Sequence, residues 1–421
     1  MRIAIVSAVD FVPWQFRSEF IATLIHNGHD VTVITRSGPY VERLKAIGAN
    51  HYEIPASRFI SFLTDFLYFF RLYFAFRRLK PDIVYTMTAK PNIIGPLVSK
   101  LARVPRTYSL YGGIGFFHSE GGNRRTRLFK RFGRTLIFFG SKFADGIVFQ
   151  NHEDRSSFLQ AGAVTEDRSL VVNGSGVNLH EFSAETVDLE KIRRLREEFG
   201  VPESGVLVAM ISRITENKGV LDYVEASRSF VDQEGRVRFI HVGSFEKGSL
   251  ESVSPEQIRK TSTFEQVGFR TDVRDILFAA DIVVLPSFHR EGVPNTLLEA
   301  LAMRRPIVTT DNVGCREVVD DGVNGFLVPV RDSAALAAAI RQLVDDPALR
   351  KKMGEAGYEK AERQFTVESV NKEILEKLFR MENVRIPDFY TEEIDGDLVI
   401  HLSGEQRRVP VPSVARDHKL N

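Results

Sequence analysis

The chain has 421 residues, of which 43% are hydrophobic and 26% are charged. These values are typical of a soluble globular protein of two or three domains, and they exclude a collagen-like, low-complexity or largely disordered chain. The single cysteine, Cys315, excludes an intramolecular disulfide and favours a reducing compartment. Residues 1–6 already resemble a strand, so no signal peptide is expected.

The net charge of +1 conceals an uneven distribution of charge. Residues 1–180 hold 23 Lys and Arg and 13 Asp and Glu, whereas the whole chain holds 56 and 55. The front part therefore carries a net charge of +10 and the remainder one of −9. A basic front half predicts contact with an anionic surface or ligand. Nucleic acid is disfavoured because the basic residues lack a zinc-ligand or RNP-like context, so the expected surface is an anionic membrane.

Short apolar runs rich in β-formers alternate with longer helical patterns along the chain. Strands are predicted at 3–7, 30–35, 82–86, 107–110, 146–150 and 170–173, and then at 205–212, 237–242, 263–267, 282–286, 306–310 and 325–328. This alternation indicates an α/β protein with two doubly wound, Rossmann-like parallel sheets. Near the end of the chain, helices are predicted at 334–360 and 366–381.

These elements predict a domain of residues 1–176 and a second of residues 177–365, joined at the glycine-rich stretch 174–176. Residues 366–383 are expected to form a helix that packs back across the domain boundary. Residues 384–421 are expected to be an appended tail or hairpin, disordered at its end. Neither half has a Gly-x-Gly-x-x-Gly or Walker loop, which disfavours an NAD-dependent enzyme, and no cluster has metal-ligand spacing, so no metal is expected.

The most informative segment is 285–301, where a buried strand leads through a loop into a helix that begins near Pro294 and Asn295. The free N–H groups of that first turn favour a phosphate or a sugar oxygen. Glu291 in the loop and Glu299 in the helix offer carboxylates to hydroxyl groups. On spacing alone, a surface-loop glutamate and an ordinary helical glutamate explain them equally well.

A second loop places two cations on the same edge of the predicted sheet. Arg213 and Lys218 follow the first strand of the back half, where they can clamp a diphosphate and stabilise a departing nucleotide. A solvated loop with scattered charges is the alternative. Cations for phosphate and carboxylates for hydroxyls, on one edge, fit a nucleotide-sugar.

The order of these motifs resembles glycosyltransferase family four, whose members are retaining enzymes of the GT-B fold, with two Rossmann-like domains facing each other across a cleft. The resemblance is carried by Glu291-Gly292-Val293-Pro294 with Glu299, by Ser212-Arg213 with Lys218-Gly219, and by residues 267–273 and 311–325. It covers most of 205–330, and more weakly 80–84 and 173–182.

The resemblance implies a role for each matching residue. Arg213 and Lys218 would hold the donor diphosphate and, with Glu291, serve catalysis. Glu299 would bind the ribose hydroxyls, and Phe269 and Arg270 would frame the base. The donor sugar and the distal phosphate would contact Glu291 and the backbone of Gly292, Val293, Pro294, Asn295 and Thr296. A nucleotide-sugar, expected to be a UDP-sugar, would be the co-substrate, with no metal or other cofactor.

A glycine-rich loop follows the strand at 107–110 and contains Gly112, Gly113 and His118. His118 is expected to contact the donor sugar or to shuttle a proton, although a loop histidine bonded to nearby backbone is an equal alternative. This loop, with 148–151 and 174–178, looks like bacterial family members that extend polyprenyl-diphosphate-linked saccharides. Such a lipid-linked saccharide is therefore the expected acceptor, bound by the front domain at Gly112 and Gly113.

Residues 124–142 contain seven cations and no acidic residue. In a helix, all the cations except Arg125 fall within an arc of about 120°, with aromatic and aliphatic side chains opposite. Such a helix can lie on anionic lipid, or it can pack its apolar side on the sheet. The residues expected at the membrane or the acceptor are Arg124, Arg127, Lys130, Arg131 and Arg134. Residues 59–80 form a second candidate helix with aromatics on nearly all faces. Either two neighbouring elements bury it or part of it faces lipid headgroups, and the second is expected.

These features predict a cytoplasmic enzyme, peripherally associated with the inner face of the cytoplasmic membrane, that glycosylates a lipid-linked saccharide during synthesis of a surface polysaccharide. Two alternatives remain. One is a nucleotide-sugar 2-epimerase of the same two-domain architecture. The other is a non-catalytic protein that binds a nucleotide-sugar.

Overall fold

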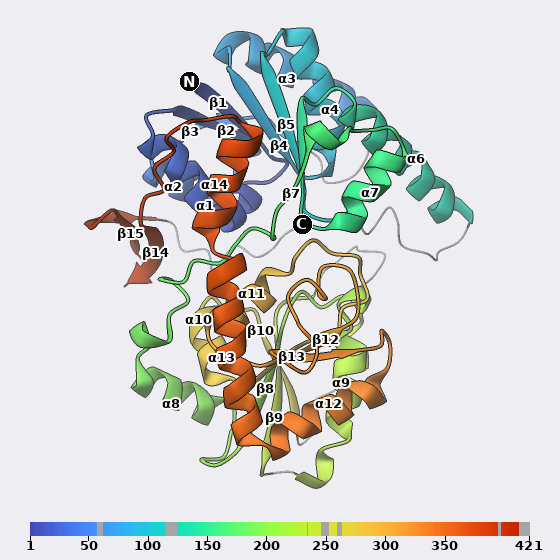
Figure 1. The fold of residues 1–421 in the computed structure, drawn as a ribbon, viewed down its shortest axis with the longest axis vertical. Coiled ribbons are helices and arrows are strands. Elements are labelled where there is room, and N and C mark those ends of the chain that lie inside the picture. Colours follow the sequence, from blue (N-terminus) through green and yellow to red (C-terminus); the bar gives the residue numbers. More distant parts are fainter. Residues whose placement is uncertain are drawn as a thin grey trace. The chain divides into compact units, whose positions relative to one another are not determined.

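The computed structural model describes residues 1–56, 62–114, 124–233, 235–245, 252–258, 263–394 and 397–411. The chain separates into two compact units (Figure 1). The first unit contains Met1–Ser175 and Val367–Leu420, and the second contains Gly176–Thr366. Each unit is built around a parallel sheet of its own.

The sheet of the first unit has seven strands in the order β3-β2-β1-β4-β5-β6-β7, all paired in parallel. The strands are β1 (Arg2–Val6), β2 (Asp30–Thr35), β3 (Asn50–Glu53), β4 (Ile83–Met87), β5 (Arg106–Tyr111), β6 (Gly146–Phe149) and β7 (Ser169–Val171). Six of them match the predicted strands. The seventh, β3, was not predicted because it is a short, polar edge strand that lacks a run of apolar residues.

Helices cover both faces of this sheet. They are α1 (Phe11–His26), α2 (Val41–Ala46), α3 (Phe62–Leu79), α4 (Ala89–Ala102), α6 (Arg124–Ser141) and α7 (His152–Gln160). Alternating residues of β1 enter different cores: Ile3 and Ile5 pack with side chains of α1, whereas Ala4 and Val6 pack with side chains of α3 and α4. The described helices include none that is both long and apolar enough to cross a membrane.

The sheet of the second unit has six parallel strands in the order β10-β9-β8-β11-β12-β13. They are β8 (Val206–Ile211), β9 (Val237–Val242), β10 (Phe264–Gly268), β11 (Ile282–Leu285), β12 (Ile307–Thr310) and β13 (Gly325–Val328), as predicted to within one residue at each end. The helices are α8 (Leu189–Glu198), α9 (Val220–Arg228), α10 (Val273–Ala279), α11 (Asn295–Ala302), α12 (Ser333–Asp345) and α13 (Pro347–Gln364). One continuous hydrophobic core joins these elements.

The single helix predicted at 334–360 is wrong, because the structure has two helices there. α12 ends at Asp345 and α13 begins at Pro347. The side chain of Asp346 accepts a hydrogen bond from Leu349 N at 2.9 Å and so caps α13. Proline lacks the N–H that would continue α12 but fits the first position of a new helix.

The predicted helix at 366–381 is shorter and changes form. α14 (Val367–Glu373) belongs to the first unit and leads into a π-helical turn, Ile374–Leu378. The next residue, Phe379, is fully buried and stacks on Tyr108 at 4.6 Å between ring centroids. Phe379 also packs edge-on against Phe20 and Tyr85, so this segment completes the core on the α1 side of the sheet.

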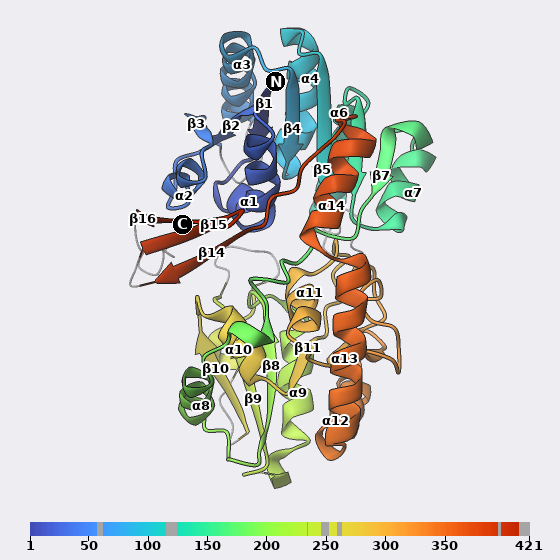
Figure 2. The ribbon, with the colours of Figure 1, turned by 60° about the vertical axis from the view of Figure 1, so that its left-hand side comes forward.

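The segment expected to be a tail or hairpin contains three antiparallel strands (Figure 2). They are β14 (Phe389–Ile394), β15 (Asp397–Leu402) and β16 (Glu405–Pro410). Phe389 and Ile400 belong to the same hydrophobic core as Trp14 of α1. Arg43 of α2 forms an ion pair with Glu393 at 2.6 Å, so this small sheet is part of the first unit. The residues expected to be disordered, 412–421, lie outside the described ranges.

Candidate functional site

The candidate site lies at the carboxyl edge of the second unit's sheet. At β8 the chain adds strands first on one side (β9, β10) and then on the other (β11, β12, β13). β8 has β9 on one side and β11 on the other. The helices that follow these strands diverge: α9 packs against α12, and α11 against α13. In open α/β sheets, ligands bind outside the strand ends at such a switch point. The loops after β8 and β11 are those that carry Arg213, Lys218 and Glu291.

Lys218 and Glu291 are in direct contact at this point. Lys218 Nζ donates to Glu291 Oε1 at 2.7 Å and to Oε2 at 2.5 Å, and Ser287 Oγ donates to Oε1 at 2.6 Å. The side chains of Lys218 and Glu291 are only 15% and 12% exposed. Burial by itself would raise the pKa of Glu291, but the charge of Lys218 and the donated hydrogen bonds outweigh it and lower that pKa. Glu291 is therefore an ionised carboxylate at neutral pH.

The loop after β8 rests directly on the loop after β11. The carbonyl oxygen of Asn217 accepts hydrogen bonds from Ser287 Oγ, Phe288 N and His289 N at 3.0 to 3.2 Å. At Gly219, whose φ is +75°, a Cβ would lie 2.0 Å from the carbonyl oxygen of Pro286. Only glycine permits this approach, which sets the distance between Lys218 and the loop of Glu291.

The loop after β12 supports the other side of Glu291. Asn312 Nδ2 donates to His289 O at 2.7 Å, and Thr310 Oγ1 donates to Ser287 O. At Gly314, whose φ is +90°, a Cβ would lie 1.9 Å from the carbonyl oxygen of Gly292. These supports of the site were not predicted from the sequence: Ser287, Asn217, Asn312 and Gly314. The available signal was their position just beyond the ends of strands that share one sheet edge.

The first turn of α11 leaves backbone donors available. Pro294 occupies the N-cap position and offers no side-chain cap. Within the described residues, no acceptor lies on the N–H groups of Asn295 and Thr296. Gly292, Val293 and Pro294 are buried, and Asn295 and Thr296 are half-buried. Two free N–H groups at the positive end of a helix dipole are a suitable site for an anionic oxygen.

Glu299 lies one turn further along α11 and is half-buried. Burial raises the pKa of its carboxyl group to about 7. Across the described ranges, its side chain has no hydrogen-bond or ion-pair partner. The Glu299 carboxyl group can therefore accept hydrogen bonds from hydroxyl groups of a ligand.

The other predicted donor-site residues are placed differently. Arg213 is exposed in the loop after β8, and its carbonyl oxygen accepts from Ser212 Oγ at 3.0 Å. Phe269 is exposed after β10. Arg270 donates to both carboxylate oxygens of Asp272, at 2.9 and 2.7 Å, and to Glu198 at 2.6 Å. β10 stands two strands away from β8, and the role of Phe269 and Arg270 beside the base stays a prediction.

In the first unit, Gly112 and Gly113 follow β5 as predicted, and Gly113 has a φ of +114°. The N–H of the next residue, Ile114, donates to Asp154 Oδ2 at 3.3 Å, which anchors the start of this loop. His118 lies outside the described residues, so its role stays a prediction. In the described ranges, His, Cys, Asp and Glu form no group of three or more that is placed to bind a metal ion.

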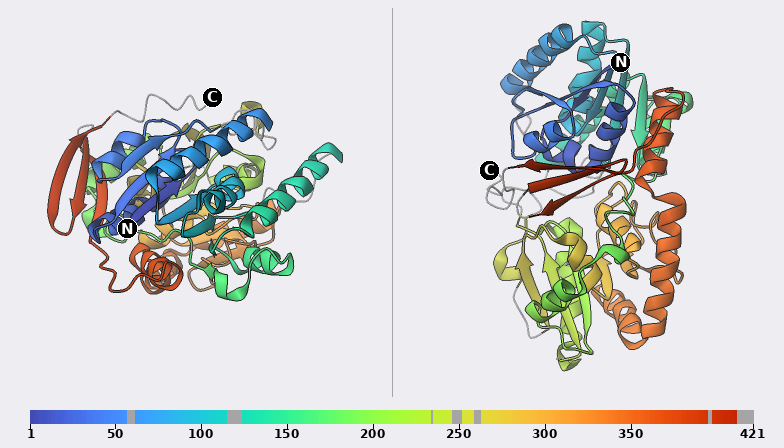
Figure 3. Two further views of the ribbon diagram at one scale, coloured as in Figure 1. Left: turned by 90° about the horizontal axis from the view of Figure 1, so that it is seen from above. Right: turned by 90° about the vertical axis from the view of Figure 1, so that its left-hand side faces the viewer.

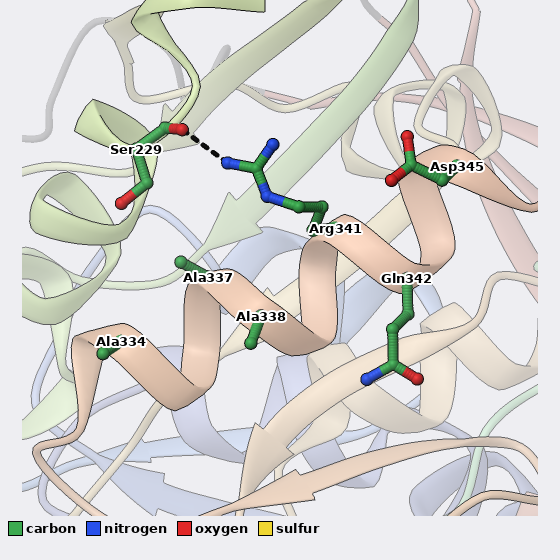
Figure 4. Close-up of a pocket in the computed structure, with 7 residues that line it drawn as sticks. All are labelled: Ser229, Ala334, Ala337, Ala338, Arg341, Gln342 and Asp345. Carbon is green, nitrogen blue, oxygen red and sulfur yellow. Dashed lines mark hydrogen bonds between the residues drawn. The ribbon is translucent and has the colours of Figure 1, made fainter.

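A hollow of about 570 Å³ lies elsewhere in the second unit, along α12 (Figure 4). Its charged groups are already engaged: Arg341 donates to Ser229 O at 2.6 Å, and Asp345 pairs with Arg236 at 3.0 Å. The rest of the lining is Ala334, Ala337, Ala338 and Gln342. This hollow lacks the converging donors and acceptors of the Lys218–Glu291 site.

Comparison with known proteins matches both units to glycosyltransferase models. Residues 18–180 match "Glycosyltransferase Family 4", and residues 205–346 match "Glycosyl transferases group 1". The chain is 30% identical to the putative glycosyltransferase EpsD of Bacillus subtilis, over 67% of this chain and 72% of that protein. It is 27% identical to the N,N'-diacetylbacillosaminyl-diphospho-undecaprenol alpha-1,3-N-acetylgalactosaminyltransferase of Campylobacter jejuni, over 83% of this chain and 91% of the relative.

Among solved structures, the fold is similar to that of Anabaena HepE in complex with UDP and glucose, with a TM-score of 0.75 and 21% identity. That match covers 90% of this chain and all of the other. The two Rossmann-like sheets therefore form a GT-B fold, as predicted. The chain belongs to glycosyltransferase family four and is a retaining glycosyltransferase.

Proposed function

We propose that this enzyme transfers a sugar from a nucleotide-sugar, with retention, to a polyprenyl-diphosphate-linked saccharide during synthesis of a bacterial surface polysaccharide. The observation that carries the proposal is the buried Lys218–Glu291 pair beside the uncapped first turn of α11. A cation and free N–H groups can hold a diphosphate, and the carboxylate of Glu291 and the carboxyl group of Glu299 can accept from sugar and ribose hydroxyls.

The chemistry depends on stabilising the leaving group. The bond between the anomeric carbon and the diphosphate oxygen breaks, and its electron pair stays on the diphosphate. The acceptor hydroxyl forms the new bond to the anomeric carbon, and its proton is released to water. Lys218, with Arg213 on the same loop, would stabilise the negative charge that develops on the diphosphate.

The comparisons support the choice of donor and acceptor. The name of the Campylobacter jejuni relative specifies a diphospho-undecaprenol-linked acceptor, which supports a lipid-linked saccharide here. The Anabaena HepE structure contains UDP and glucose, which supports a UDP-sugar as the donor.

Helix α6 supports a membrane surface as a partner. Its N-terminal end stands clear of the other helices of its unit (Figure 3). α6 packs closely on α4 at Gly140, where a Cβ would lie 2.4 Å from Ile93 O. This packing leaves Leu128, Phe132 and Phe139 exposed, by 70%, 56% and 53%.

The same helix exposes cations beside these apolar side chains. Arg124, Arg127 and Arg131 are exposed, and Lys130 and Arg134 are half-buried. Helix α3 also packs on α4, and it exposes Phe66, Leu67, Phe70 and Phe74. Exposed apolar groups next to cations fit the interface of an anionic bilayer.

A thermal-shift panel tests the donor site. The panel contains UDP, GDP, ADP and dTDP and their glucose conjugates. Only the compounds that carry one particular base among these should raise the melting temperature of the protein, because a ligand that binds only the folded state stabilises it. With a lipid-linked saccharide, that donor should yield a glycosylated lipid. Release of free nucleotide and a 2-epimer from the donor alone would indicate the epimerase instead. Binding without any turnover would leave only the non-catalytic alternative.

Flotation with liposomes tests the membrane surface. The wild-type protein should float with anionic vesicles at low salt and dissociate as salt rises. The double variant Arg127→Glu with Arg131→Glu should abolish flotation. The control, Lys351→Glu with Lys352→Glu, makes the same change of charge at exposed positions of α13 and should still float. Equal flotation of both variants would rule out docking through α6.

A further inference from the structure

Lys218, one of the two cations assigned to the donor site, is already neutralised within the protein. Two of the three N–H groups of Lys218 point to the carboxylate oxygens of Glu291, at 2.7 and 2.5 Å. Glu291 is held in this position by Ser287 Oγ and by the bond from Glu291 N to Val313 O at 3.4 Å. The two charges form one fixed unit with a net charge of zero.

This geometry brings a bound phosphate close to the carboxylate. Within the described part of the chain, the third N–H of Lys218 has no acceptor, so it can donate to a phosphate oxygen at an ordinary hydrogen-bond distance of about 2.8 Å. A phosphate oxygen placed there lies within about 5 Å of the Glu291 oxygens, because both are held by the same ammonium group. Like charges this close repel strongly in a site from which water is largely excluded.

We infer that Glu291 weakens binding of the nucleoside diphosphate product relative to the nucleotide-sugar donor, and so promotes product release. This inference rests on the proposed function. In the donor complex, a sugar hydroxyl donates to the carboxylate and offsets the repulsion. When the bond to the anomeric carbon breaks, the diphosphate keeps the electron pair and gains one negative charge, while the hydroxyl departs with the transferred sugar. The attraction is lost and the repulsion grows in the same step.

Calorimetric titration of the full chain tests this inference. The probes are the tightest-binding nucleoside diphosphate among UDP, GDP, ADP and dTDP, and its glucose conjugate. Glu291→Gln keeps the size of the side chain but removes its charge. In this variant the Kd of the diphosphate should fall about tenfold or more, whereas the Kd of the glucose conjugate should stay the same or rise.

Two control variants separate the local charge from other effects. Glu291→Asp retains the charge and should leave the Kd of the diphosphate within about threefold of wild type. Glu216→Gln removes an exposed carboxylate from the same loop as Lys218, where water screens it, and should have little effect. If Glu291→Gln does not fold, as judged by its melting curve, Glu291→Ala removes the same charge and replaces it in the titration.

The possible outcomes are distinguishable. If wild type binds no member of the panel, the proposed function fails and the inference fails with it. If wild type binds a diphosphate but loss of the Glu291 charge does not tighten it, the inference is wrong and the proposed function stands. If Glu216→Gln tightens the diphosphate as much as Glu291→Gln does, the effect is a general one of net charge, and the inference is likewise overturned.

Discussion

Replacement of Lys218 by alanine is the most direct test of the site. The change removes a charge that lies 2.5 to 2.7 Å from the carboxylate of Glu291, in a setting where that carboxylate is 12% exposed. Breaking a buried ion pair by removing one partner costs about 3–5 kcal/mol. Ser287 still donates to Glu291, and the pair retains some contact with water, so we expect about 3 kcal/mol.

The same substitution should slow transfer by more than it weakens binding. Loss of one charged group that stabilises the leaving diphosphate lowers kcat by about 10²–10³. Transfer of labelled sugar to a lipid-linked acceptor gives kcat and the donor KM, and chemical denaturation gives the free energy of unfolding. Lys352→Ala, an exposed lysine on α13, is the matched control and should leave both unchanged.

The double variant Lys218→Ala with Glu291→Gln separates stability from catalysis. Removing both charges leaves no unpaired buried ion, so the unfolding free energy should return to within about 1 kcal/mol of wild type. The rate should not recover, because the diphosphate still lacks its cation. Near-normal rates in both Lys218→Ala and Arg213→Ala would refute the diphosphate role of this edge.

Two further substitutions probe the rest of the site. Glu299→Gln should raise the donor KM about tenfold with little change in kcat, since a ribose contact serves binding more than the chemical step, and an unchanged KM would remove Glu299 from the ribose site. Burial raises the pKa of Glu299 to about 7, whereas the unfolded chain loses this proton from about pH 4.5. Between these pH values the folded state holds one proton more than the unfolded state. The free energy of unfolding therefore falls as the pH rises towards 8, by up to about 3 kcal/mol. Glu299→Gln should therefore melt higher than wild type at about pH 8 but not at about pH 5, and equal melting at both would contradict the buried carboxyl. Gly314→Ala places a Cβ 1.9 Å from Gly292 O and should lower the melting temperature and raise the donor KM, whereas Gly322→Ala, with φ +74° and nothing within 4 Å of its Cβ, should carry only backbone strain. Equal effects of the two alanines would show that the close approach to Gly292 is not what matters.

Much of the fold could be predicted from the sequence because strand and helix periodicities are local. Every predicted strand is present, since each is an apolar run that its own residues define. The predicted secondary structure was wrong where a few polar contacts outweigh the hydrophobic periodicity. Asp346 and Pro347 divide one helical pattern into α12 and α13, and the polar β3 forms only because β2 offers it an edge.

The candidate site was predicted in outline and completed by the fold. The sequence identified Lys218 and Glu291 as residues of loops that follow strands, and therefore as residues of one sheet edge. It did not show that their side chains touch, nor that Arg270 in the loop after β10 pairs with Asp272 and Glu198.

The sequence by itself determined the two α/β units, their strands and the residue types on the carboxyl edge of the second sheet, because these follow from local patterns. Only the tertiary structure decided which loops are neighbours. β8 and β11 lie side by side although β9 and β10 separate them in the chain, since the strand order depends on how whole helices cross over the sheet. Because β8 and β11 are neighbours, and because Gly219 and Gly314 allow their loops to approach closely, Lys218 and Glu291 form one buried ion pair.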